Sequence, residues 1–207
     1  MKWAVEAEQM IAAPAHEVWH VISKPGNLEL CHPFCAQNPV QAWPGDDSRD
    51  EVHYLSGRVY ERRFGQWLEG TGYDLEIFSS DDALASVSWR ITPIDEQSCT
   101  LRITVCPYTF QKLPAVVRWF LYTLRVKPML RSYLDSVVKG FEWYVTRGEP
   151  VRGISSASTR GFRHQNQLLT NIPRTTFEIM RIVLYRWMAN AGSLHACHLQ
   201  SISASIA

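Results

Sequence analysis

The sequence has no uninterrupted hydrophobic run long enough to cross a membrane. Its longest apolar stretch, Leu113 to Leu124, contains Arg118 and falls short of the ~20 residues that a transmembrane helix needs. Carboxylates at Glu6 and Glu8 occupy the place where a secretory signal peptide has its apolar segment. The cysteines number five, and an odd count favours reduced thiols over a disulfide framework. We therefore expect a soluble cytoplasmic protein without stable membrane insertion.

The chain also lacks a strong charge of either sign. Its formal net charge is +1 over 207 residues, so no basic field argues for binding to nucleic acid. Apolar residues make up 46% of the chain, with eight Trp, eight Tyr and eight Phe. This balance is typical of a globular domain, and large rings both fill cores and line apolar ligand cavities.

Strand-like segments separated by turn residues occupy the middle of the chain. In residues 73–78, 85–93 and 99–107, apolar residues alternate with polar ones. Each of these strands therefore has one dry face and one solvated face, as in an antiparallel sheet covered on one side. Less regular strands are expected at 2–12, 38–43, 51–55 and 59–69, with short helices between Pro14 and Leu30.

A long amphipathic helix follows the strands. Apolar residues recur at helical spacing from Leu130 to Tyr144, and Gly148 is expected to cap the end. An earlier helical segment carries Phe120 and Leu124 and is interrupted at Pro128. The element order predicts an α+β domain in which these helices cover the dry face of the sheet and leave an apolar cavity.

Four short segments connect the chain to a known superfamily: IAAPAHEVW at 11–19, PGNL at 25–28, WLEGTGYDL at 67–75 and KGFEW at 139–143. With the element order, they resemble SRPBCC proteins, also called Bet v 1-like, START-related or helix-grip proteins, in a bacterial subgroup of unassigned role. The resemblance covers residues 2–150 and implies a curved antiparallel sheet wrapped around a long C-terminal helix. Lipid carriers, hormone receptors, polyketide cyclases and oxygenase domains share this fold, so the fold does not fix the function.

Two parts are expected: a helix-grip domain at 1–152 and an atypical tail at 153–207. The tail is rich in Ser, Thr, Arg and Asn and shows little periodicity before Phe177. Similar proteins continue with N-Q-F-G-x-H-P-W-F-S, which is absent here. One choice of codons for that segment, read one base later, encodes Ile154 to Phe162 as written. We therefore expect a disordered or loosely helical tail, with a shifted reading frame as one hypothesis and an amphipathic membrane or partner helix as another.

Inward-facing polar and aromatic residues are the candidates for ligand contact. Tyr54 is in phase with Val52 and is expected to point inward, whereas Arg62 and Arg63 are expected on a solvated strand face with cross-strand charge pairs. Tyr60 and Phe64 could also point inward, but Arg62 lies between them in the same phase, so the sequence leaves the direction of these rings open. The candidate ligand-binding residues are His32, His53, Tyr54, Tyr60, Tyr73, Trp89, Ile103, Tyr133 and Phe141.

Two motifs carry metal-binding residue types. His16 to His20 reads HEVWH, and two histidines four apart on a helix can bind zinc. The helix is short, the histidines lie opposite Val18 and Ile22, and no third ligand follows, so we favour coincidence. Cys31 and Cys35 form a single pair, for which buried thiols are the favoured interpretation. No metal, no cofactor and no catalytic residue is assigned.

The leading hypothesis is a protein that binds a hydrophobic or amphipathic small molecule, such as a lipid, an isoprenoid or a polyketide-like aromatic. The alternative is a cyclase or dehydratase that uses a cavity His or Tyr as general acid or base. A third is a non-catalytic module that acts through the tail. Because the sequence shows no clear inward acid–base pair, we favour binding over catalysis. The sequence does not indicate an oligomeric state.

Overall fold

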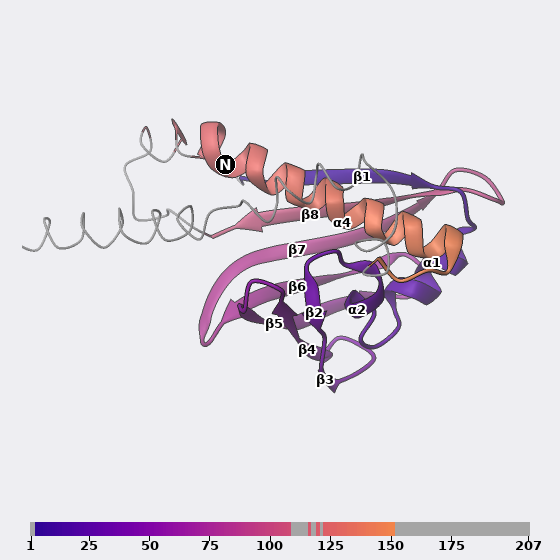
Figure 1. The fold of residues 1–207 in the computed structure, drawn as a ribbon, viewed down its shortest axis with the longest axis horizontal. Helices are drawn as coiled ribbons and strands as arrows, with labels where there is room; N and C mark the ends of the chain where they lie inside the picture. Colours follow the sequence, from indigo (N-terminus) through magenta and orange to yellow (C-terminus); the bar gives the residue numbers. More distant parts are fainter. Residues whose placement is uncertain (1–2, 109–115, 117–118, 121, 152–207) are drawn as a thin grey trace, which may run out of the picture. The chain divides into compact units, whose positions relative to one another are not determined.

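The computed structural model describes residues 3–108, 116, 119–120 and 122–151. Its strands form one antiparallel sheet in the order β1-β8-β7-β6-β5-β4-β2, and β3 pairs with β4 (Figure 1). The strands are β1 (Val5–Ile11), β2 (Cys35–Gln37), β3 (Val40–Ala42), β4 (Arg49–Tyr54), β5 (Val59–Leu68), β6 (Gly72–Ser79), β7 (Asp82–Pro93) and β8 (Cys99–Pro107). The tail from residue 153 lies outside the described residues.

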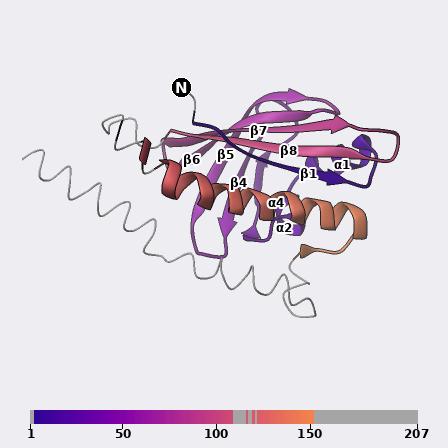
Figure 2. The same cartoon turned by 90° about the horizontal axis from the view of Figure 1, so that it is seen from above.

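Two short helices follow the first strand, and a long helix follows the last. They are α1 (Ala15–Ile22), α2 (Leu28–Cys31), the π-helical turn η1 (Tyr122–Val126) and α4 (Lys127–Arg147). Helix α4 runs along β1 and β8 (Figures 1 and 2). It ends as predicted, because Gly148 adopts a left-handed φ of 70° and its N–H bonds the Tyr144 carbonyl at 2.8 Å. None of the described helices is long and apolar enough to span a membrane.

The dry face of the sheet is packed as the alternation predicts. Trp89 on β7, Ile103 on β8 and Phe141 on α4 are all buried. The rings of Tyr73 and Trp89 lie 5.7 Å apart, and those of Trp89 and Phe141 lie 5.0 Å apart. Side chains therefore fill the centre between the sheet and the long helix.

The segment before α4 faces the opposite way from the sequence prediction. Phe120 and Leu124 were expected to cover the sheet, but they are 53% and 69% exposed. Tyr122 and Val126 are buried instead, and the Tyr122 ring contacts Trp3 at 4.5 Å. The π-helical turn accounts for the correction at Leu124, because its wider spacing rotates the apolar stripe relative to an α-helix.

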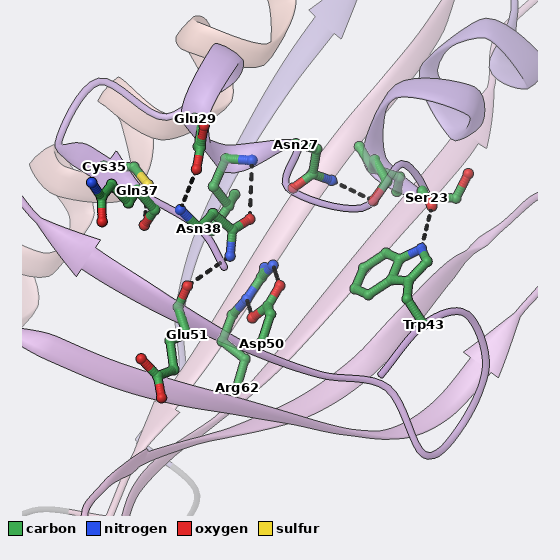
Figure 3. Close-up of polar contacts among 12 residues, drawn as sticks. Ser23, Asn27, Glu29, Cys35, Gln37, Asn38, Trp43, Asp50, Glu51 and Arg62 are labelled. Atoms are coloured by element: carbon green, nitrogen blue, oxygen red, sulfur yellow. Dashed lines mark hydrogen bonds and ion pairs between the residues drawn. The ribbon is translucent and has the colours of Figure 1, made fainter. Parts of the chain in front are cut away.

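Polar contacts fasten α2 to the strands beside it (Figure 3). The backbone N–H of Asn38 donates to Glu29 Oε1 at 2.7 Å, and Asn38 Nδ2 donates to the Glu51 carbonyl at 2.8 Å. Trp43 Nε1 donates to the carbonyl of Ser23 at 2.8 Å, which holds the end of α1. These bonds fix the residues that follow α2.

Helices α2 and α4 approach each other at a glycine. A Cβ atom on Gly140 would lie 2.2 Å from the Cys31 carbonyl oxygen, so no larger residue fits without movement. Gly140 lies in the KGFEW segment of the family resemblance. The close approach brings the residues after α2 against α4, where the candidate site lies.

Candidate functional site

Three predicted residues from three separate elements meet in one hydrogen-bonded chain. His32 follows α2, Tyr54 ends β4 and Tyr133 lies on α4. His32 Nε2 lies 2.8 Å from Tyr133 Oη, which lies 3.0 Å from Tyr54 Oη. The sequence predicted each as a ligand residue, and the fold brings them together.

The protonation of this chain follows from burial. Desolvation, assisted by the positive charge of Arg62, lowers the pKa of His32 to about 3, so the ring is neutral at pH 7. Burial also raises the pKa of Tyr54 and of Tyr133, so both keep their hydroxyl protons. The Phe34 N–H donates to His32 Nδ1 at 3.2 Å, which leaves the ring proton on Nε2 to donate to Tyr133.

This chain has more donor hydrogens than it has hydrogen bonds between its three members. The His32 ring and the two tyrosines carry three donor hydrogens, and the chain contains two hydrogen bonds. Whichever tyrosine donates to the other, one hydroxyl hydrogen takes no part in these two hydrogen bonds. The arrangement can therefore donate a hydrogen bond to a ligand oxygen.

Aromatic rings surround this chain at the surface. Phe34 stacks on Tyr133 with centroids 5.5 Å apart, and Tyr60 contacts the edge of Tyr54 at 5.6 Å. The three tyrosines and Phe34 are half-buried, whereas His32 is buried. We call His32, Phe34, Tyr54, Tyr60 and Tyr133 the aromatic cluster. It combines apolar rings with a hydrogen-bonded pair of hydroxyl groups at a partly open position.

Arg62 corrects the sequence prediction, because it points inward and is only 5% exposed. Its guanidinium pairs through two nitrogens with the Asp50 carboxylate, which is fully buried opposite it on β4 (Figure 3). Burial alone would lower the pKa of Arg62, but Asp50 outweighs burial and raises that pKa. Arg63, on the other face, pairs with Glu61 at 2.7 Å as a half-exposed strand charge.

Tyr73 lies deeper than the aromatic cluster and is fully buried. Its ring contacts Phe64 at 5.0 Å, and the Arg62 guanidinium lies 5.3 Å from the same Phe64 ring. Burial raises the pKa of Tyr73, and the charge and hydrogen-bonding capacity of Arg62 partly oppose that rise. The charge of Arg62 therefore acts both on Tyr73 and on His32 of the aromatic cluster.

Sequence reasoning missed Asp50 and Asn27 as inner-face polar residues. Ser48, Asp50 and Val52 are buried, whereas Arg49 between the first two is exposed. The sequence signal for Asp50 was its position two residues before Val52, which is in phase with the inward-facing Tyr54. Asn27 precedes α2 in a loop, where no periodicity reports burial.

The remaining predicted residues lie apart from the aromatic cluster. His53 alternates with Tyr54 on β4, lies on the opposite face and bonds Glu51 Oε2 at 2.8 Å, so we leave it out of the site. Trp89, Ile103 and Phe141 belong to the filled centre of the domain.

The HEVWH motif lies at the surface. His16, Glu17 and His20 are exposed, whereas Trp19 is buried and donates from Nε1 to Glu69 at 2.9 Å. Cys31 and Cys35 are buried, and burial raises the pKa of the Cys31 thiol. In the described part of the chain, no three His, Cys, Asp or Glu side chains are grouped to hold a metal ion.

Two hollows stand out among the described residues, and neither is lined by a predicted ligand residue. The larger, about 570 Å³ and open, lies beside the HEVWH motif and Glu69. The smaller, about 120 Å³, is lined by Asn27, Leu30 and Tyr144 among others. The predicted cavity walls contact one another instead.

A family model described as polyketide cyclase/dehydrase and lipid transport matches residues 2–142. The chain belongs to this family. No curated protein matches the sequence. The match covers every strand and most of α4, including the whole aromatic cluster.

Solved structures confirm the helix-grip fold of this family member. DynU16, a putative protein of the dynemicin biosynthetic locus, is 14% identical with a TM-score of 0.56 over 73% of this chain, which spans 50% of DynU16. Norcoclaurine synthase from Thalictrum flavum is 14% identical, with a TM-score of 0.53 over 70% of this chain and 94% of its own. TTHA0849 from Thermus thermophilus is 18% identical, with a TM-score of 0.54 over 70% and 98%. At these identities the likeness shows the fold alone.

Proposed function

We propose that the protein binds an amphipathic small molecule, with an aromatic, polyketide-like or lipid body, at the aromatic cluster. The Tyr54–Tyr133 hydroxyl pair, half-buried among aromatic rings, carries this proposal. Rings alone would serve a core, but hydroxyl groups among half-buried rings can bond a ligand oxygen. The family description, which includes lipid transport, supports the same class of ligand.

The packing indicates how the ligand enters. Trp89 and Phe141 close the centre of the domain, so the ligand body separates the half-buried rings of Phe34, Tyr54 and Tyr60. Covering ~300 Å² of apolar ligand surface contributes roughly 7 kcal/mol before the cost of association. The hydrogen bond from the tyrosine pair then orients the ligand.

Native mass spectrometry of the full-length protein purified from its host tests this proposal. We expect a small amphipathic molecule to remain bound, and we expect the Tyr54→Phe/Tyr133→Phe double variant to lose it. Tyr108→Phe is the matched control, because its hydroxyl bonds Glu76 at an exposed position away from the aromatic cluster. Protein that stays empty, or equal retention by all three proteins, contradicts the proposal.

The hydrogen-bonded chain also supports a second candidate, a cyclase or dehydratase. A tyrosine whose pKa is raised by burial keeps its proton at neutral pH, so it can donate a hydrogen bond to a substrate oxygen and stabilise negative charge that develops there. His32, with its pKa lowered to about 3, is a weak base and serves to orient Tyr133. Conversion of the bound molecule to a product lacking one water, abolished in Tyr54→Phe, distinguishes this activity from binding.

A further inference from the structure

Large apolar side chains gather on the surface just before α4 and within η1. Val116, Trp119, Phe120 and Leu124 are each at least half exposed, and we call these four residues the apolar strip. Single exposed apolar residues are ordinary, but a contiguous group marks a surface that binds a partner or a membrane.

The packing of the domain does not use the apolar strip. The inner side of η1 is formed by Tyr122 and Val126, which are buried, and the Tyr122 ring lies 4.5 Å from that of Trp3. On the outer side, the rings of Trp119 and Phe120 contact each other edge-on at 5.1 Å. The fold is therefore held by one side of this segment, and the exposed rings are available to a partner.

Basic side chains follow the apolar strip along the chain. Arg125, Lys127 and Arg131 are exposed. Arg131 lies 3.1 Å from the Asp135 carboxylate, whereas Arg125 and Lys127 form no ion pair within the residues that the structure describes. Residues 97–134 of the sequence contain no Asp or Glu, although the whole chain has a formal net charge of only +1. Positive charge is therefore concentrated beside the exposed rings.

This combination fits a lipid surface better than a protein partner. Trp and Phe side chains partition into the boundary between headgroups and acyl chains, while Lys and Arg beside them attract anionic headgroups. The cores of protein–protein interfaces are instead depleted of charged residues, and of Lys in particular. The chemistry of the segment therefore selects an anionic bilayer.

We propose that the apolar strip, together with Arg125 and Lys127, docks the protein on the surface of an anionic lipid bilayer. Trp119 and Phe120 enter the headgroup region, and the two basic side chains contact acidic lipid headgroups. The docking is peripheral, because none of the described helices is long and apolar enough to span a membrane. The apolar strip shares no residue with the aromatic cluster, so docking and ligand binding can be tested separately.

Co-sedimentation of the full-length protein with phosphatidylcholine vesicles, with and without phosphatidylserine, tests the proposal. We expect binding to be about tenfold tighter with phosphatidylserine, because each basic side chain near an anionic surface contributes about 1 kcal/mol, or roughly fivefold in affinity. Arg125→Ala/Lys127→Ala should remove most of this preference. Lys139→Ala is the matched control, since Lys139 is also exposed on α4 but lies farther along the helix.

A second pair of variants tests the rings. Trp119→Ala/Phe120→Ala should weaken binding to both kinds of vesicle about tenfold, because less apolar surface leaves water. Met10→Ala/Ile94→Ala removes two exposed apolar side chains elsewhere and should bind like the wild type. The molecule retained in native mass spectrometry should be unchanged in all four variants.

Three results would overturn the proposal. Wild-type protein that does not sediment with phosphatidylserine vesicles excludes bilayer docking, and a dimer lost in Trp119→Ala/Phe120→Ala would then assign the strip to a second copy of the chain. Equal weakening in Met10→Ala/Ile94→Ala would show non-specific adsorption. Binding retained by both the ring and the basic variants would place docking elsewhere in the chain, such as residues 153–207.

Discussion

The two halves of the inner face of the sheet differ in what they bury. Under α4, strands β1, β7 and β8 bury aliphatic and aromatic side chains such as Trp89 and Ile103 against Phe141. On β4, β5 and β6 the inner face buries the Asp50–Arg62 ion pair together with the hydroxyl of Tyr73. An apolar core of the same volume would be at least as stable as a buried ion pair. We therefore propose that the polar half serves ligand binding, whereas the apolar half stabilises the fold.

Removing one member of the buried ion pair should produce the largest effect. Asp50→Ala leaves the Arg62 guanidinium buried without its counter-charge, so we expect the free energy of unfolding to fall by about 3–5 kcal/mol. Urea denaturation measures this loss. Asp74→Ala, which breaks a one-third-exposed pair with Arg90, should cost less than about 1 kcal/mol. Equal losses would remove the contrast between the two pairs.

The second-largest expected effect is the dependence of stability on pH. An unfolded histidine titrates near pH 6.5, whereas burial lowers the pKa of His32 to about 3 in the folded state. Below about pH 6.5 the unfolded chain binds a proton that the folded chain excludes, so stability falls as the pH falls, by up to about 1.4 kcal/mol per unit. His32→Gln should flatten this slope in urea titrations, whereas His53→Gln on the outer face should keep it. An unchanged slope in His32→Gln would show that other groups cause the loss.

The contact between α2 and α4 should be sensitive to a single methyl group. Gly140→Ala places a Cβ against the Cys31 carbonyl and should cost about 1–3 kcal/mol, because backbone must move to admit it. Gly65→Ala is the matched control, since its Cβ would meet nothing within 4 Å. The midpoints of thermal or urea unfolding compare the two variants. A stable Gly140→Ala protein would mean that the helices separate easily.

The smallest effects should lie along the hydrogen-bonded chain itself. Tyr54→Phe removes one hydrogen bond and should cost about 1 kcal/mol, whereas Tyr133→Phe removes two and leaves His32 Nε2–H unsatisfied. Tyr133→Phe should therefore be the more destabilising of the two in urea denaturation. The reverse order would indicate that Tyr54, not Tyr133, lies at the centre of the chain.

Much of the fold could be predicted because periodicity reports burial directly. The alternation through Tyr73, Trp89 and Ile103 fixed the dry face, and the apolar stripe to Tyr144 fixed α4. Leu124 was assigned to the wrong face because a π-helical turn changes the phase and leaves no mark in composition. Helical periodicity in the sequence does not predict which side chains are buried where the backbone departs from a regular α-helix.

The candidate site could be predicted in part. Tyr54 and Tyr133 were found because each lies in phase with apolar neighbours, but their hydrogen bond joins β4 to α4 and no local pattern reports it. Arg62 was assigned to solvent because an arginine is rarely buried. Its burial depends on Asp50, twelve residues away, and only the pairing of β4 with β5 brings the two together.

The most direct test of the contrast between the polar and the apolar half of the inner face replaces the whole Asp50–Arg62 ion pair by apolar residues. The double variant Asp50→Leu/Arg62→Met should be as stable as the wild type or more so, by up to about 4 kcal/mol, in urea denaturation. The same protein should lose its bound molecule in native mass spectrometry. If instead the variant is destabilised and still retains the ligand, the pair serves the fold and the functional assignment of the polar half is wrong.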